Sequence, residues 1–564
     1  MSPGPAGRRG GTTAPASPAG GTPEPAGPAA TLTPGGGRAS LAGLSAAIVA
    51  VAATMAVLGW WGLVRSNSMG NDEVATRWAA LLPLPQLFHL LSHVDAVHGL
   101  YYLLMHPWVA VGSSPAILRI PSVIAMMAAG ALTVVLGRQL TGSVWAGLLA
   151  GLVMVLTPSV SFYAQTARSY AMVLACVVGS TLALLHALRG EAAGLVSVRR
   201  RWAGYAVLVT LGAYLNEMSL LVLAAHGITV LLARYGEPAV RRWLAAAAAG
   251  TLLAGPVLLG SLVEHGAIGW IGYPNWPGIK PLLQDYFGMT IVAAVVVVAC
   301  IAAAVLPGPG GWPGQPGGTD GLTAAPPAWW RSGGISLPSV AVPLLLVPAA
   351  LLIAESYVLK PLYVDRYVLY GEAGAALLAG GGAYRMGRWL RDAAARRRGV
   401  PAGQAAGSWR VLAWAPGIAV CACLLVFQLG AQQHIRTPGS RRYDFGGPSR
   451  YVAANARKGD GILYFGTLYR KAELGYPGDF RNTTDFAMAV SPLRAGDFRG
   501  IDKPFALTGP LMLHYRRIWV FGIWPSLRIP PGPLRDESNE LFRDFTLAGS
   551  QQFHGILVTL WVRR

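Results

Sequence analysis

Five groups of charged and polar residues interrupt the long apolar stretches of this 564-residue chain. In chain order they are Asn71-Asp72-Glu73, Asp95 with His98 and Tyr101, Gln165 with Arg168, Asn216-Glu217, and Lys360 with Asp365 and Arg366. A carboxylate can take the proton of a hydroxyl group, and a cation can stabilise negative charge that develops on a phosphate. Ionisable groups at membrane depth are costly and usually face a protein interior, so we expect these groups to meet in one cavity.

The first two groups each allow a chemical and a structural interpretation. Asp72 could be a general base, or it could cap the helix-like stretch that follows it. Adjacent helical residues point about 100° apart, so Asp72 and Glu73 cannot both aim at one atom. Asp95 and His98 share a helical face, where they could polarise each other, bind a metal or hold an acceptor. Alternatively, Asp95 could cap a helix.

The other three groups supply cations and two more carboxylates. Arg168, beside Gln165, could hold a phosphate or carboxylate, or it could extend to the membrane surface. Glu217 lies at a tight turn in apolar sequence, where it would need a metal or an arginine as partner unless water solvates it. Arg366 and Lys360 could neutralise phosphate oxygens, or Arg366 could pair with the aspartate before it among interfacial tyrosines.

The composition excludes a water-facing exterior for most of the chain. Charged residues make up 12% of it, whereas soluble globular proteins carry about 25%. The net charge of +20 comes from basic residues gathered in short loops. We interpret it as the positive-inside bias of a membrane protein and expect no nucleic-acid partner. The cysteines lie in apolar stretches, which argues against a disulfide framework: Cys176, Cys300, Cys421 and Cys423.

Apolar runs long enough to cross a lipid bilayer recur along the chain. A span needs about 20 apolar residues, and the first run, from about Leu41 to Val64, exceeds the apolar core of a signal peptide. Further runs bring the expected number of spans to about eleven: 119–137, 143–161, 169–188, 202–216, 219–234, 243–263, 290–306, 336–356, 367–384 and 411–430. The arginine-rich loops then place the N-terminus in the cytoplasm and the C-terminal region outside the cell membrane.

Changes in composition predict the domains. Residues 1–38 are expected to be a disordered cytoplasmic tail, 39–430 a transmembrane domain with a Pro/Gly-rich cytoplasmic linker at 307–334, and 431–564 an extracytoplasmic α/β domain. Two stretches of the first outer loop, 74–91 and 100–111, are expected to be interfacial helices. In the C-terminal region, short β-prone runs predict strands at 461–465, 517–521 and 555–562.

The order of these motifs resembles that of GT-C glycosyltransferases of the protein-mannosyltransferase and aminoarabinose-transferase type. The likeness rests on the acidic pair after the first span, Asp95-x-x-His98 with Tyr101-Tyr102, Arg119-Ile120-Pro121-Ser122, Tyr163-x-Gln165-x-x-Arg168-x-Tyr170, and Arg366-Tyr367 before a late span. It is best over residues 60–235 and weaker over 355–380.

The resemblance implies a polytopic α-helical, GT-C-like fold and an inverting transfer outside the cell membrane. A mannose-like or pentose sugar would move from a polyprenyl-phosphate donor to a hydroxyl of a glycan, lipid or protein acceptor. Asp72 would be the general base, Glu73 its catalytic neighbour, and Arg168 and Arg366 the phosphate contacts. The remaining expected substrate-binding residues are Asp95, His98, Tyr101, Gln165, Glu217 and Lys360.

Two departures from the family pattern leave a metal site open. Many relatives read Asp-x-His-Pro-Pro where this chain has Asp95-Ala96-Val97-His98-Gly99, and many carry a histidine where it has Asn216-Glu217. A divalent metal ion is therefore a possible cofactor with no assigned ligands.

Two other classes of function fit the same spans. A transporter or flippase of a lipid-linked saccharide would share the spans and basic groups. It would not need a carboxylate in the first outer loop, and it would favour broken helices at the midplane. A non-catalytic cell-envelope assembly subunit is the third class. An outward cavity shared by Asp72, Arg168, Glu217 and Arg366 would favour the enzyme.

Overall fold

The computed structural model describes residues 34–64, 68–263, 269–306, 333–397, 409–522 and 534–564. The chain divides between Gly43 and Leu44, and residues 44–564 form a compact unit that contains all the contacts of the site. The expected tail and the expected linker fall largely outside the described residues. Helix α1 (Pro34–Trp60) begins inside the segment expected to be tail.

Every apolar run expected to span the membrane is helical. The helices are α1, α5 (Pro115–Thr141), α6 (Val144–Leu156) with α7 (Pro158–Ala164), α8 (Tyr170–Ala192), α9 (Val198–Leu215), η2 (Glu217–Leu221) with α10 (Val222–Ala233), α11 (Glu237–Leu253) with α12 (Gly255–Val263), α14 (Ile291–Val305), α15 (Leu337–Val358), α16 (Glu372–Arg397) and α17 (Trp409–Phe427). Among the described residues, 4 helices are long and apolar enough to cross a membrane, or up to 7 spans if each bent pair is one. The expected number of eleven spans stays a prediction.

Large apolar side chains cover the outside of several of these helices. Leu252, Leu259 and Ile291 are each more than half exposed. Apolar surface of this extent is costly in water and favourable in lipid. The exposure therefore fits a multi-pass membrane protein.

The first outer loop folds into short helices, as expected. These are α2 (Asn71–Leu81), α3 (Leu84–Leu91), η1 (Ala96–His98) and α4 (Gly99–Trp108). Pro83 lies between α2 and α3. Proline disfavours helical geometry in the residue before it but fits the start of a helix, so one amphipathic stretch becomes two helices. Later connecting elements are α13 (Trp276–Phe287), η3 (Asp365–Gly371), α18 (Leu429–His434) and η4 (Pro438–Ser440).

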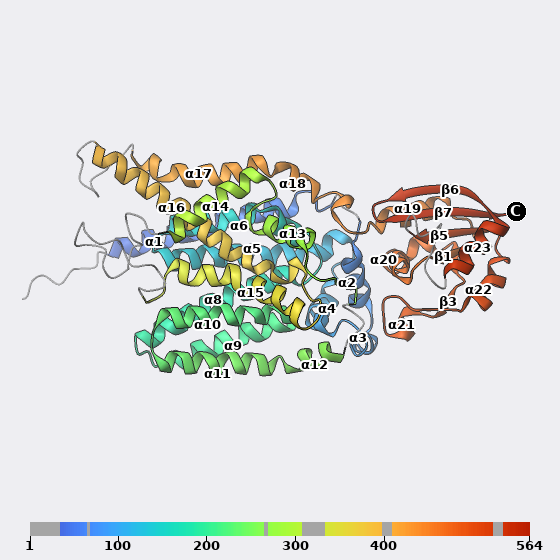
Figure 1. Cartoon of the computed structure of the whole chain (residues 1–564), viewed down its shortest axis with the longest axis horizontal. Coiled ribbons are helices and arrows are strands. Elements are labelled where there is room, and N and C mark those ends of the chain that lie inside the picture. The colour runs from blue at the N-terminus through green and yellow to red at the C-terminus, as the bar shows by residue number, and fades with distance from the viewer. Residues whose placement is uncertain (1–33, 65–67, 264–268, 307–332, 398–408, 523–533) are drawn as a thin grey trace, which may run out of the picture. The chain divides into compact units, whose positions relative to one another are not determined.

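The C-terminal sheet domain contains a mixed sheet of strand order β2-β1-β5-β7-β6 (Figure 1). Its strands are β1 (Asp460–Tyr464), β2 (Thr483–Asp485), β5 (Arg517–Gly522), β6 (Phe545–Phe553) and β7 (Ile556–Arg563). Strand β1 pairs in parallel with β2 and β5, and β7 is antiparallel to β5 and β6. A separate pair joins β3 (Met488–Val490) and β4 (Ile501–Asp502). The helices are α19 (Gly446–Asn455), η5 (Thr467–Arg470), α20 (Lys471–Gly475), η6 (Pro477–Phe480), α21 (Pro492–Ala495), α22 (Phe505–Met512) and α23 (Leu534–Asp544).

Three strands confirm the expected ones, and one long strand was missed. Strands β1, β5 and β7 match the predicted runs to within one residue at each end. Their side chains are largely buried, so their sequences carry the apolar signal of a strand. Strand β6 is an edge strand with mostly exposed positions, so its sequence lacks the apolar signal of a buried strand.

Helix α20 packs directly against α2 of the first outer loop (Figure 1). A Cβ atom on Gly475 would lie 2.9 Å from Val74 Cγ2, so this approach requires glycine. Arg77 Nη1 donates to the Gly475 carbonyl at 3.1 Å, and the Met69 N–H donates to the Tyr476 hydroxyl at 2.8 Å. These contacts hold the C-terminal sheet domain against α2, the helix that carries Asp72 and Glu73.

Candidate active site

Asp72 lies in the first turn of α2, with its side chain 32% exposed. The N-cap of α2 is Gly70, so Asp72 does not cap the helix. Its Oδ1 accepts a hydrogen bond from Asn71 Nδ2 at 3.1 Å, and its Oδ2 lies 3.9 Å from Arg366 Nη2. The carboxylate is thus accessible to a substrate and lies beside a cation that could hold an anionic group.

Arg366 and Asp72 belong to one cluster of charged side chains. Arg366 lies on η3, between aromatic rings. Its Nε donates to the Tyr170 hydroxyl at 2.9 Å, and its guanidinium carbon lies 5.6 Å from the Trp270 and Tyr367 ring centroids. Asp365 accepts a hydrogen bond from the backbone N–H of Arg366, not from its side chain. These cation–π contacts position the guanidinium, and its Nη groups remain able to bind an anion.

Arg168 is the second cation and is almost fully buried after α7. Its Nη1 donates to the Tyr102 hydroxyl at 2.8 Å, and Tyr102 in turn donates to Asp95 Oδ2 at 2.6 Å. Arg168 Nη1 also lies 3.8 Å from Asp95 Oδ2. Its buried Nε has no hydrogen-bond partner among the described residues. Arg168 is therefore held inside the protein and does not extend to the membrane surface.

Asp95 ends this series of hydrogen bonds, and His98 lies close to it. Asp95 precedes η1 with a φ of 60° and makes no side-chain capping bond. His98 is buried, and its Nδ1 has no partner in the part of the chain that the structure describes. Burial and Arg168 lower the pKa of His98 to about 4, although Asp95 and Asp72 act to raise it. The imidazole is therefore neutral at neutral pH.

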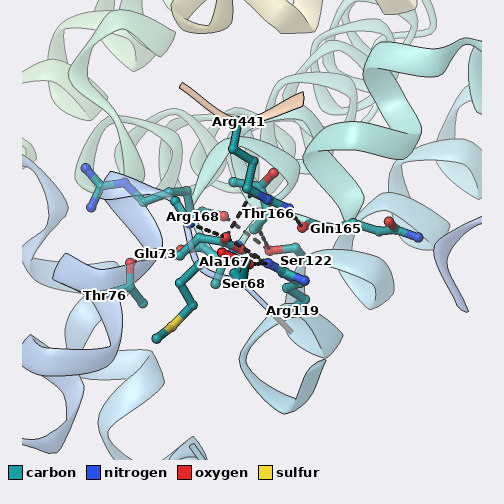
Figure 2. A network of polar contacts seen from close by, with 12 residues as sticks. Ser68, Glu73, Thr76, Arg119, Ser122, Gln165, Thr166, Ala167, Arg168 and Arg441 are labelled. Atoms are coloured by element: carbon teal, nitrogen blue, oxygen red, sulfur yellow. Dashed lines mark hydrogen bonds and ion pairs between the residues drawn. The ribbon is translucent and has the colours of Figure 1, made fainter. Parts of the chain in front are cut away.

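Glu73 is the centre of a buried polar network, shown in Figure 2. Arg119 donates from Nε to Oε1 at 2.7 Å and from Nη2 to Oε2 at 2.9 Å. Arg441 Nη1 lies 2.9 Å from Oε2. The backbone N–H groups of Ala167 and Gly70 each donate at 3.1 Å. Burial would raise the pKa of Glu73, but Arg119 and Arg441 outweigh it and lower the pKa to about 2.

These contacts do not support the catalytic role expected for Glu73. Both of its oxygens already accept hydrogen bonds from protein donors, so neither is free to take a proton from a substrate. The network instead ties α2 to α5, to the segment that carries Arg168, and to the residues before α19. Arg441 completes it by donating from Nη2 to the Gln165 carbonyl at 2.7 Å. Glu73 therefore positions Asp72.

The contacts of Gln165 are structural, whereas the sequence predicted that it binds substrate. Its Nε2 donates to the carbonyls of Leu58, Gly59 and Trp61 at 3.1, 2.9 and 2.8 Å. These carbonyls lie at the C-terminal end of α1, where helix carbonyls lack partners within the helix. Gln165 therefore caps α1.

Glu217, Lys360 and Tyr101 differ in how they relate to the cluster. Glu217 is half-buried in η2, with Ser261 and Lys360 among its neighbours, and Lys360 is exposed. No hydrogen bond or ion pair within the described ranges joins Glu217 or Lys360 to Asp72. Tyr101 is buried on α4, with its ring centroid 6.4 Å from that of Tyr102. The structure thus brings Asp72, Arg168 and Arg366 together, whereas no hydrogen bond or ion pair within the described residues joins Glu217 to them.

The sequence reasoning missed Lys471, the first residue of α20. Its side chain is buried, and its charge acts on Asp72 and Asp95. Nothing in the local sequence marks Lys471, because it stands in a polar domain where lysine is ordinary. Arg119 had a signal: a charge inside an apolar run implies a buried partner.

The cations around Asp72 keep its carboxyl group ionised. Burial would raise the pKa of Asp72, but Arg168, Arg366 and Lys471 outweigh it and hold the pKa below its ordinary value. The carboxylate is therefore ionised at neutral pH. These cations would repel a divalent metal ion at the same place. No group of three or more His, Cys, Asp or Glu among the described residues is arranged to hold a metal. The donor set favours an anion as ligand.

No protein-family model matches the sequence, and no curated protein matches it. The structure is similar to the crystal structure of ArnT from Cupriavidus metallidurans bound to undecaprenyl phosphate, with 12% identity and a TM-score of 0.51 over 93% of this chain and 98% of ArnT. The apo structure of ArnT matches with 11% identity and a TM-score of 0.54, over 92% and 98% of the two chains. At this identity the likeness concerns the fold. The expected GT-C-like architecture, a helical membrane region followed by a C-terminal sheet domain, is therefore confirmed.

Proposed function

We propose that this protein is a membrane glycosyltransferase that moves a sugar from a polyprenyl-phosphate donor to an acceptor hydroxyl at the outer face of the cell membrane. The observation that carries the proposal is the ionised, partly exposed Asp72 with Arg366 Nη2 3.9 Å away and Arg168 nearby. A base and cations for a phosphate leaving group are the two requirements of this reaction. The fold of ArnT, which has been crystallised with undecaprenyl phosphate, supports the donor class.

In the proposed reaction, the acceptor oxygen attacks the anomeric carbon from the face opposite the phosphate. Asp72 takes the proton of the acceptor hydroxyl as the new carbon–oxygen bond forms. The bond between the anomeric carbon and the phosphate oxygen breaks, and its electron pair stays on the phosphate. The configuration at the anomeric carbon is inverted. Arg366 and Arg168 stabilise the charge on the departing phosphate, which needs no general acid.

Donor binding would also activate the base. In the free protein Arg168 and Arg366 lower the pKa of Asp72 and make it a weak base. A donor phosphate would share these two cations with the carboxylate, so its arrival would raise the pKa of Asp72. The base would be strongest when the donor is in place.

The remaining features of the proposal come from the sequence and from the family that it resembles. The arginine-rich loops place the N-terminus in the cytoplasm and the C-terminal sheet domain outside. The sugar is a mannose-like hexose or a pentose, and the acceptor is a glycan, a lipid or a protein.

The substitution Asp72→Asn tests the proposed base. In membranes supplied with radiolabelled polyprenyl-phosphate mannose, or the corresponding pentose donor, we expect transfer to fall by a factor of about 10² to 10⁴. The matched control is Asp392→Asn, which changes an aspartate paired with its neighbour Arg391 on α16. Unchanged transfer by Asp72→Asn would remove Asp72 as the base.

A flippase of a lipid-linked saccharide is the second candidate, because three helix pairs are bent. The bends are 68° between α6 and α7, 56° between α11 and α12, and 64° between α13 and α14. Broken helices are typical of transporters. A flippase would move the labelled lipid across the bilayer without forming a glycosidic bond, so analysis of the labelled product separates the two candidates.

A further inference from the structure

A lysine of the C-terminal sheet domain reaches the cluster around Asp72. Lys471 is 7% exposed, and its charge acts on Asp72, Asp95 and Arg168. Its Nζ lies 5.0 Å from the Phe498 ring centroid. No ion pair or hydrogen bond of its ammonium group occurs within the described residues. Lys471 is therefore a buried cation without a direct anionic partner.

The fold holds Lys471 firmly in this place. The preceding residue, Arg470, is buried, with Nε 2.7 Å from Asp485 and Nη2 2.5 Å from Asp502. After it, Gly475 packs on Val74 of α2. The two ends of this short segment are thus fixed to the sheet and to the first outer loop. The position of the ammonium group is a property of the domain interface and not of a free surface chain.

A buried ammonium without a partner is costly unless an anion joins it. The cluster has three cations, Arg168, Arg366 and Lys471, against the two carboxylates Asp72 and Asp95. His98 is neutral at neutral pH. Arg499 adds a further positive charge near Lys471, so the cluster carries a net positive charge that favours an anionic ligand such as a phosphodiester. A polyprenyl-phosphate sugar is such a diester.

We propose that Lys471 binds the phosphate of the polyprenyl donor together with Arg168 and Arg366, so that the C-terminal sheet domain forms part of the active site. This inference rests on the proposed function, because the donor class comes from it. It makes the domain a component of donor binding, and transfer depends on the contact between α20 and α2.

The pH dependence of binding provides a specific test. The groups that face Lys471 are Asp72 of α2, Asp95 before η1, Arg168 after α7 and Arg499 of its own domain. Burial lowers the pKa of Lys471 to about 8, although Asp72 and Asp95 act to raise it. The ammonium group is charged below this pH and loses its charge above it. An arginine at this position would stay charged throughout.

The experiment measures binding of undecaprenyl phosphate to the purified full chain at pH 7 and pH 9. We expect Lys471→Gln to weaken binding at pH 7 by about tenfold or more, the loss of one charge-assisted contact. Wild type should weaken between pH 7 and pH 9, whereas Lys471→Arg should not. The control Lys458→Gln changes an exposed lysine of the same domain and should bind as wild type does. Undecaprenol, which has no phosphate, should bind equally to wild type and Lys471→Gln.

Stability measurements separate a binding role from a structural one. Removal of an unpaired buried cation should leave the unfolding temperature unchanged or raise it. A Lys471→Gln protein that binds undecaprenyl phosphate as wild type does would overturn the inference. An equal loss of undecaprenol binding would also overturn it, because the effect would not depend on phosphate.

Failure of this inference can be distinguished from failure of the proposed function. If Asp72→Asn abolishes transfer while Lys471→Gln binds the carrier normally, the proposed function stands and the inference fails. If Lys471→Gln weakens phosphate binding but wild type transfers no sugar, the phosphate site stands and the proposed reaction fails.

Discussion

Arg366 Nη2 lies 3.9 Å from Asp72 Oδ2, although most of the membrane region separates the two residues in sequence. This distance exceeds that of a hydrogen bond. The pair is therefore close enough for each charge to affect the other, yet a substrate oxygen can compete for either partner. Asp72 and Arg366 are also both partly exposed, at 32% and 24%.

Arg366→Lys should reduce transfer by about a hundredfold, the effect of removing one preorganised donor to a developing anion. An ammonium group cannot present the two parallel donors of a guanidinium, and it would alter the contacts with Trp270 and Tyr367. Steady-state kinetics in membranes measure the effect. Tyr170→Phe removes only the partner of Arg366 Nε and should cost less. If Arg366→Lys transfers sugar as fast as wild type, the planar guanidinium is not required.

Glu73→Gln should destabilise the protein by about 3–5 kcal/mol, because it leaves Arg119 and Arg441 as uncompensated buried charges. Thermal unfolding of the purified protein measures the loss. The control Glu237→Gln changes an exposed ion pair with Arg241 and should have little effect. A Glu73→Gln protein that unfolds like wild type but has lost transfer would return Glu73 to a catalytic role.

Gln165→Ala should lower stability by about 1–3 kcal/mol, since it removes the side-chain donor of the Gly59 carbonyl, whereas the Leu58 and Trp61 carbonyls still accept from Arg436. The Michaelis constant for the donor should not change in the protein that remains folded. A large rise in that constant at unchanged stability would instead place Gln165 at the substrate.

Tyr102→Phe should raise the Michaelis constant for the donor about tenfold. It removes the hydroxyl that joins Arg168 to Asp95, and a hydrogen bond to a charged group contributes about 1.5–3 kcal/mol. Tyr205→Phe is the matched control. It removes another buried tyrosine hydroxyl, whose partner is His226 and not Arg168 or Asp95. Equal behaviour of the two variants would mean that Arg168 keeps its place without Tyr102.

The kcat/KM of transfer should not fall between pH 7 and pH 5. The pKa of Asp72 is held below its ordinary value, and that of His98 is lowered to about 4. Asp72 therefore stays ionised and His98 stays neutral over this range. The pH profile of kcat/KM reports the groups of the free enzyme. An acid limb centred near pH 6 would contradict this expectation and point to a histidine that ionises.

The two neighbouring acids after the first span show the limit of the sequence. Asp72 and Glu73 have the same chemistry and adjacent positions, and helical geometry states only that they point in different directions. In the structure Glu73 turns into the packing between α2 and α5, whereas Asp72 faces the cations. Glu73 is the buried partner because Arg119 and Arg441, from distant parts of the chain, pair with it.

The helical runs and three of the sheet strands could be predicted from the sequence, and so could the grouping of Asp72, Arg168 and Arg366, although the prediction also placed Glu217 with them. Apolar length and periodicity are local properties, so they can be read from neighbouring residues. The sequence alone could not show that Gln165 caps α1 or that Lys471 lies beside Asp72. Both depend on which distant groups lie within a few ångströms, and the energy of a buried polar group is set by those neighbours.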